Sequence, residues 1–229
     1  MDKTLTLALI VTLAAIVALP AAAQKSTVPD LLRRALTSPS AGVAQLFAYD
    51  FEDVTTGEHV VTVRGRVDPS RREGDRVEIT HASNTDPKEK VDLKKIDERY
   101  ERRADGGIFC DSQSEPDVTQ VADRGASPKG RVFTFTPRPP KDADGEMKAI
   151  MKKVTAEVVV DEGTATLTAF NARLTKPHSV MLVAKVNAMD LKTQCQAAPN
   201  GRAYAARREM ILSGSGMGRS FDTRTIQTI

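Results

Sequence analysis

The sequence predicts an α+β fold, in which one large and mainly antiparallel sheet carries about three helices. Two observations support this fold class. Segments with the two-residue alternation of strands follow one another and are separated by turn residues. The helical segments lie before this series or as insertions within it, and not between successive strands as in a βαβ architecture.

An export signal precedes the predicted domain. Lys3 gives a weakly positive start, the run from Leu5 to Leu19 has no charge, and Pro20 and three alanines ending at Ala23 follow. A membrane span needs about 20 apolar residues, and this run is shorter. We therefore interpret residues 1–23 as a cleaved signal peptide with Gln24 as the new N-terminus. Residues 24–229 then form a single domain that works in a bacterial periplasm.

Three segments have helix signals. Ser26 to Asp30 combines a capping residue with an early Pro and Asp, and leucines at helical spacing follow as far as Leu36. Asp86 and Pro87 predict the start of a second helix, which should end before Gly107. The apolar residues between Met147 and Val154 recur at the spacing of a short amphipathic helix.

About ten segments have the composition and alternation of strands. In the segment from Ser179 to Ala188, valines and alanines occupy one face, while Met181 and Val183 make the other face partly apolar. A strand that is apolar on both faces predicts that something covers each side of the sheet near its middle. The predicted strands are residues 46–54, 59–67, 76–81, 118–122, 131–138, 156–160, 164–172, 179–188, 203–213 and 220–229.

The two cysteines, Cys110 and Cys195, both lie in the predicted mature domain. Two thiols in an oxidising compartment usually pair, so we predict one disulfide. By the chain-entropy relation, closing a loop of this length contributes about 4.5 kcal/mol at most.

No pattern in the sequence indicates catalysis, a cofactor or a metal ion. His59, His81 and His178 are scattered and match no ligand spacing, and the acidic run that ends at Glu146 lacks the later ligands of a calcium loop. The glycine-rich stretch near Gly214 fits neither a nucleophile elbow nor a phosphate loop. The formal net charge is +3 and the charges are interleaved, which argues against a nucleic-acid partner. We therefore expect a protein that is not an enzyme.

The order of elements resembles that of one periplasmic family. The segment Phe133-Thr-Phe135-Thr-Pro137 leads through a short helix into Val158-Val-Val160-Asp161 and a hairpin, and then into a long strand that ends at Val186. This layout is similar to that of the outer-membrane lipoprotein carrier superfamily, which includes the soluble lipoprotein chaperone, its outer-membrane receptor and a regulator of envelope stress. The resemblance implies a strongly curved half-barrel sheet with helices over its concave face, and an apolar hollow between them that can take acyl chains.

On this resemblance, the leading hypothesis is a non-enzymatic periplasmic protein that binds a lipid-like or acylated ligand in the hollow. Methionine is soft and adaptable, which suits a lipid pocket and equally suits ordinary core packing. The alternative is an envelope-sensing or protein-interaction module with a filled core. The partners implied are a lipid, an acylated protein or an envelope protein, and after processing the chain is not an integral membrane protein. The residues predicted to line the hollow are Phe133, Phe135, Met147, Ile150, Met151, Met181 and Val183.

The export signal gives a first prediction. Replacing Ala23 with a bulky residue should block processing, because signal peptidase requires small residues before the cleavage site. N-terminal sequencing of the exported wild-type protein should start at Gln24, and a start well away from it would show that the predicted site is wrong.

Overall fold

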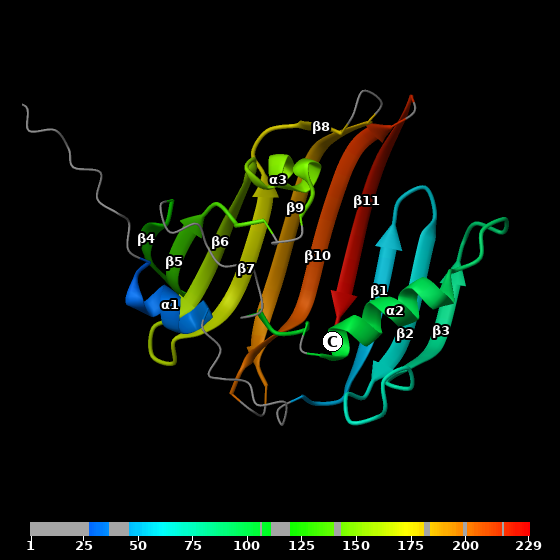
Figure 1. Cartoon of the computed structure of the whole chain (residues 1–229), viewed down its shortest axis with the longest axis horizontal. Coiled ribbons are helices and arrows are strands. Elements are labelled where there is room, and N and C mark those ends of the chain that lie inside the picture. Colours follow the sequence, from blue (N-terminus) through cyan, green and yellow to red (C-terminus); the bar gives the residue numbers. More distant parts are fainter. Residues whose placement is uncertain are drawn as a thin grey trace, which may run out of the picture.

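The computed structural model describes residues 28–36, 46–105, 107–110, 120–139, 143–180, 184–198, 201–216 and 218–229. The described part is α+β, with three helices and an open sheet of 11 strands whose pairings are all antiparallel (Figure 1). This confirms the predicted fold class, while residues 1–23 and the cleavage site at Ala23 and Gln24 lie outside the described residues. The helices are α1 (Asp30–Leu36), α2 (Leu93–Ala104) and α3 (Gly145–Met151). The strands are β1 (Tyr49–Thr56), β2 (Val60–Val67), β3 (Val77–Asn84), β4 (Ala122–Ser127), β5 (Gly130–Phe135), β6 (Val154–Asp161), β7 (Thr166–Leu174), β8 (His178–Val180), β9 (Ala184–Ala197), β10 (Ala203–Gly216) and β11 (Arg219–Thr228).

The strand order shows how the chain builds the sheet from both edges. Across the sheet the order is β3-β2-β1-β11-β10-β9-β7-β6-β5-β4, and β8 pairs with β9 off this path. The chain first forms β1 to β3 at one edge, then β4 to β7 from the opposite edge, and finally fills the middle with β9 to β11. The last strand lies against the first, with Glu52 opposite Thr228 and Thr56 opposite Arg224.

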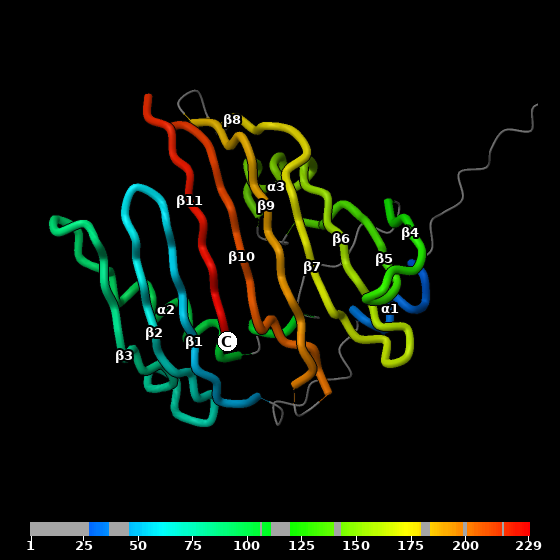
Figure 2. The backbone as a smooth tube through the Cα atoms, turned by 180° about the vertical axis from the view of Figure 1, so that it is seen from behind, coloured from blue at the N-terminus to red at the C-terminus, as the bar shows by residue number. Residues whose placement is uncertain are grey.

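The three described helices cover one face of the sheet, and none of them lies on the other face, which we call the bare face. In Figure 1, α1 lies in front of β6 and β7, and α2 lies in front of β1 and β2, whereas the view from behind in Figure 2 has the strands in front. The bare face carries charged pairs such as Arg64–Glu52 and Arg224–Glu209 across neighbouring strands. Because successive side chains of a strand point to opposite faces, this arrangement gives one apolar and one polar side.

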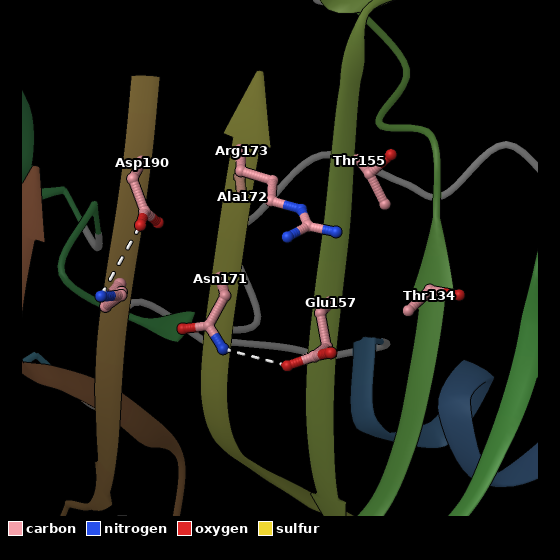
Figure 3. A pocket seen from close by; sticks show the side chains of 8 residues that line it. Thr134, Thr155, Glu157, Asn171, Ala172, Arg173 and Asp190 are labelled. Carbon is pink, nitrogen blue, oxygen red and sulfur yellow. Dashed lines mark hydrogen bonds and ion pairs between the residues drawn. The ribbon is translucent and has the colours of Figure 1, made fainter. Parts of the chain in front are cut away.

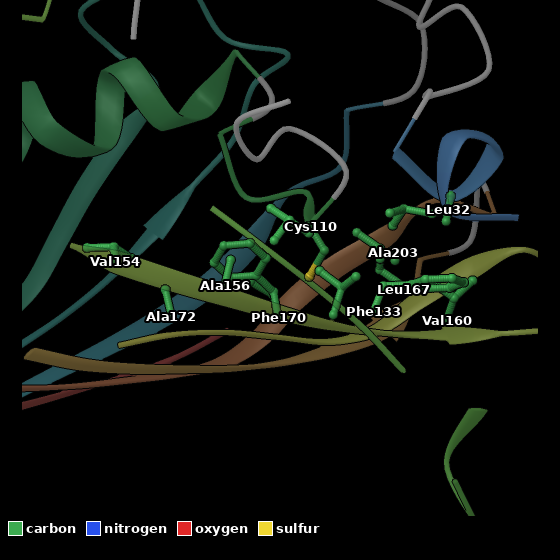
Figure 4. Close-up of a cluster of buried hydrophobic side chains, with 14 residues drawn as sticks. Leu32, Cys110, Phe133, Val154, Ala156, Val160, Leu167, Phe170, Ala172 and Ala203 are labelled. Carbon is green, nitrogen blue, oxygen red and sulfur yellow. The ribbon is translucent and has the colours of Figure 1, made fainter. Parts of the chain in front are cut away.

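The first of two cores lies between α1 and the strands β5, β6 and β7 (Figure 4). Leu32 of α1 is fully buried there, in one cluster with Phe133, Phe135 and the even-numbered residues of β6. Each such side chain contributes roughly 1.5–3 kcal/mol when it is fully removed from water. Packing of this kind explains why a helix of only seven residues is held on the sheet.

The second core lies between α2 and the strands β1 and β2. The ring of Tyr100 stacks on that of Phe51, with 3.7 Å between the ring centroids. A Cβ atom at Gly65 of β2 would lie 2.7 Å from the Phe51 ring and 2.5 Å from the backbone oxygen of Glu78. The close approach of the Phe51 ring to the backbone of β2 therefore requires glycine at this position.

The segment Ile108–Cys110, which follows α2, joins the two cores. Ile108 and Phe109 belong to the second core, and Cys110 belongs to the first. The backbone N–H of Ala205 donates to the Ile108 carbonyl oxygen over 2.8 Å. Cys110 forms a disulfide with Cys195 of β9, which confirms the predicted pair. The segment is thereby fastened to both β10 and β9 at the centre of the sheet.

The second helix begins later than predicted, at Leu93 and not at Pro87. Asp86 was expected to cap it, but its side chain accepts from the backbone N–H of Lys88, two residues on, and so forms a turn. The side chain of Asp92 instead accepts from the N–H of Lys95 and caps the helix.

Two predicted strands are also corrected. Residues 118 and 119 of the strand expected at 118–122 lie outside the described residues. The strand that follows is β4 at Ala122–Ser127, because the hairpin turn consists only of Pro128 and Lys129 and the preceding Gly125 lies in a bulge of the ladder. The strand expected at residues 179–188 is not continuous. His178–Val180 pairs antiparallel with Ala184–Val186, so these two pieces run in opposite directions and do not form one strand with two apolar faces.

The disulfide gives a second prediction. The double variant Cys110→Ala/Cys195→Ala should lose about 2–5 kcal/mol of free energy of unfolding, because the open chain has more conformational freedom when unfolded. Urea unfolding measures this loss. Wild-type protein treated with a reductant is the control and should be destabilised to a similar extent. Equal urea midpoints for oxidised wild type and variant would contradict the structural role.

Candidate functional site

The sheet has a hollow on each of its two faces. The one on the bare face lies across β5, β6, β7 and β9, and Figure 3 shows its polar side chains standing on the strands. The amide of Asn171 donates to Glu157 over 3.2 Å, and Lys192 pairs with Asp190 over 3.6 Å. These side chains alternate with buried residues of the same strands, which is the pattern of an ordinary solvated surface.

The other hollow lies on the helix-covered face, beside α2, and has a volume of about 340 Å³. Helix α2 supplies two arginines, and β1, β9, β10 and β11 supply the remaining side chains. We call it the arginine pocket. It is lined by Asp53, Thr55, Arg99, Arg103, Leu191, Arg208, Met210, Thr225 and Gln227.

Strand register places the floor of the arginine pocket in two rows. Asp53 lies opposite Gln227, which lies opposite Arg208, so that the three form one row across β1, β11 and β10. The next row, two residues further along each strand, is Thr55, Thr225, Met210 and Leu191. Arg99 and Arg103 are four residues apart on α2, so both reach the hollow from the same side of the helix.

The charges in this pocket are unevenly matched, because three arginines face one aspartate. Arg99 Nη2 donates to Asp53 Oδ2 over 2.7 Å, and Asp53 is almost completely buried. Asp53 Oδ1, Arg99 Nε and Arg103 Nη1 are buried atoms without a hydrogen-bond partner. Within the described ranges, neither Arg103 nor Arg208 forms a salt bridge.

Burial makes this excess of positive charge costly. The pKa of Arg208 is lowered, first because burial disfavours its charged form and then because the positive charge of Arg103 is nearby. The neighbouring Tyr100 accepts a hydrogen bond from Gln227 Nε2 over 2.6 Å. Burial and the negative charge of Asp53 raise the pKa of Tyr100, so it stays a neutral phenol and adds no compensating charge.

Apolar side chains continue from the arginine pocket along the helix-covered face of the central strands. Strand register puts Met210 beside Leu191, and Leu212 beside Met189. Phe221 of β11 covers Gly214, where a Cβ atom would lie 2.5 Å from its ring. Met210 is 39% exposed and Phe221 is 37% exposed, so this face is not fully shielded by the described helices. We call these residues the apolar strip: Met189, Leu191, Met210, Leu212 and Phe221.

The residues predicted to line a hollow lie elsewhere. Phe133 and Phe135 are buried in the first core, and Met151 is partly buried against that core. Ile150 is partly buried, and Met147, also on α3, is 46% exposed. Met181 and Val183 lie outside the described residues. The structure therefore brings Phe133, Phe135 and Met151 together, and their contact with a ligand stays a prediction.

Sequence reasoning missed the arginine pocket, although one signal was present. Leu93, Ile96 and Tyr100 form the apolar side of α2, and Arg103 continues the same helical spacing. A charged residue on the buried side of a helix needs a partner or a ligand. The partner strands could not be identified, because the pocket depends on the register between β1, β11 and β10.

Comparison with models of protein families, with curated proteins and with solved structures finds no match to this chain. Among the helices that the structure describes, none is long and apolar enough to cross a membrane. Within the same residues, no group of three or more His, Cys, Asp or Glu side chains could hold a metal ion.

The arrangement is suited to binding. Guanidinium groups donate hydrogen bonds and carry positive charge, and they do not exchange protons at ordinary pH. An apolar strip that adjoins such donors offers two kinds of contact within one continuous surface. The arginine pocket and the apolar strip together form the candidate binding site.

The buried acid of this site gives a third prediction. Asp53→Asn should lower the free energy of unfolding by about 2 kcal/mol, because it leaves the three arginines without a nearby negative charge. The partial exposure of Arg99 keeps this loss below that of a fully buried ion pair. Urea unfolding provides the measurement.

Glu52→Gln is the matched control for Asp53→Asn. Glu52 is the preceding residue of β1, points to the bare face and pairs there with Arg64, which is well exposed. Its loss should cost less than about 1 kcal/mol. Equal destabilisation by the two substitutions would show that Asp53 has no special electrostatic role.

Proposed function

We propose that this protein is a non-enzymatic periplasmic protein that binds a lipid-like or acylated ligand on the helix-covered face of its sheet. The observation that carries the proposal is the apolar strip, which continues into a hollow of about 340 Å³ and is partly open to solvent. Ligand sites are commonly hollows lined by apolar side chains with a few polar groups.

The contrast between the two faces supports a ligand on this side. Exposed strands of the bare face carry ion pairs such as Arg66–Asp50 and Arg64–Glu52, as expected of a surface in water. At the centre of the other face, neighbouring strands carry methionine, leucine and phenylalanine. Methionine side chains adapt to ligands of irregular shape, as an acyl chain requires.

The proposal includes export to the periplasm. A disulfide is compatible with an exported protein, and the sequence begins with a signal-like segment. We further propose, from the resemblance to the lipoprotein carrier superfamily, that the sheet curves strongly as a half-barrel around the apolar strip. In that arrangement, the strip forms part of the wall of an acyl-chain site.

A neutral apolar dye, N-phenyl-1-naphthylamine, tests the proposal. Its fluorescence should rise on binding to the wild type, and a long-chain alcohol should displace it. Met210→Gln should weaken dye binding by about tenfold, because it places a polar group of similar shape in the strip. Fluorescence titration gives both affinities.

Val60→Thr is the matched control. Val60 is 38% exposed, close to the value for Met210, but it lies on the bare face opposite Thr56. Its substitution should leave dye binding unchanged. The proposal fails if the wild type binds no dye, or if the two variants weaken binding equally.

A further inference from the structure

We infer that the arginine pocket binds the anionic headgroup of the ligand, a carboxylate or a phosphate, while the apolar strip holds the acyl chain. The inference rests on the proposed function and deepens it. It assigns to Arg99, Arg103 and Arg208 the recognition of negatively charged oxygen atoms.

The two parts of the site are continuous. Met210 and Leu191 line the arginine pocket and also belong to the apolar strip. Arg208 is two residues before Met210 on β10, so both side chains point to the helix-covered face. A single amphiphile can therefore place its charged end among the arginines and its chain along Met210 and Leu212.

The hydrogen-bonding groups of the pocket are those that an anion would satisfy. Arg99 Nε and Arg103 Nη1 are buried donors without an acceptor. A buried donor without a partner costs about 1–3 kcal/mol, and a bound oxygen atom would remove that cost once the guanidinium groups turn to meet it, because both nitrogen atoms are shielded from solvent in the unliganded arrangement. Guanidinium groups also match the geometry of carboxylates and phosphates through paired N–H donors.

The excess of positive charge in the arginine pocket favours a negatively charged ligand. Asp53 is the one acid among the residues that line the pocket, and Arg99 already occupies one of its oxygens. The charged groups near Arg103 and Arg208 are each other and Asp53, and the Arg103 guanidinium also lies 5.1 Å from the centroid of the Tyr100 ring. An anion relieves this repulsion, whereas a cation would increase it. A neutral ligand would leave the excess positive charge uncompensated, so we expect it to bind more weakly than an anion.

The experiment compares ligands that share a 12-carbon chain and differ in the head. Dodecanoate and dodecyl phosphate should bind the wild type at least about tenfold more tightly than dodecanol, the effect of one charge-assisted hydrogen bond. Displacement of N-phenyl-1-naphthylamine measures all three. Inorganic phosphate alone should displace no dye and should not compete with dodecyl phosphate.

The variants test which residues create this preference. Arg208→Gln should reduce the preference for the anionic ligands by about tenfold and leave dodecanol binding unchanged. Arg103→Gln, which removes a donor from the helix side of the pocket, should act in the same direction and provides a second test if Arg208→Gln does not fold. Thermal melting checks that each variant is folded.

Arg207→Gln is the matched control, because Arg207 is the neighbouring arginine of β10, is also partly buried and points to the bare face. It should retain the full preference. Equal binding of dodecanol and dodecanoate, or equal effects of the Arg207 and Arg208 variants, would overturn the headgroup assignment and leave the proposed function standing. Competition by inorganic phosphate as strong as that of dodecyl phosphate would overturn it in favour of a free-anion site. Failure of every ligand and of the dye to bind would overturn both proposals.

Discussion

The attachment of the short segment Ile108–Cys110 to the middle of the sheet is the constraint on which the two-core arrangement depends. Its first two residues pack under α2, while Cys110 packs with the strands beneath α1. Hydrogen bonding to Ala205 and the bond to Cys195 hold the segment on β10 and β9. Because α2 ends four residues before Ile108, this anchor also limits where Arg99 and Arg103 can lie relative to β10. The position of the arginine pocket thus follows from the covalent framework of the centre.

Much of the strand pattern could be predicted from local sequence. Strands β2, β10 and β11 alternate clearly, and their predicted ranges agree with the structure to within a few residues. The disulfide followed from there being only two cysteines. The start of α2 was missed because Asp86 and Asp92 are both good capping residues, and the choice depends on contacts made by Asp86 within its own turn. The apolar run after His178 was misinterpreted because alternation is the same in both directions of a chain and does not reveal a reversal.

The candidate site was beyond prediction for a different reason. Its floor joins residues 53, 227 and 208, which come from the first and the last two strands, and only strand register makes them neighbours. A shift of one residue in either pairing would turn Arg208 to the bare face, where Arg207 now points. Residue type alone therefore could not distinguish these two adjacent arginines, although their surroundings differ completely.

The pairing of β1 with β11 has a consequence for how this protein is made. The chain emerges from synthesis with its N-terminus first, so β1 must wait for a partner strand that follows much later in the sequence. Until then its backbone edge has no neighbour on that side and can associate with other chains. Such distant pairing also slows folding, because a long stretch of chain must be closed before the contact forms. A chain that stops early, at Arg219 for example, would lack β11, the strand that joins the two halves of the sheet. Two strand edges would then be exposed. Such a chain would be prone to aggregation and to degradation by proteases.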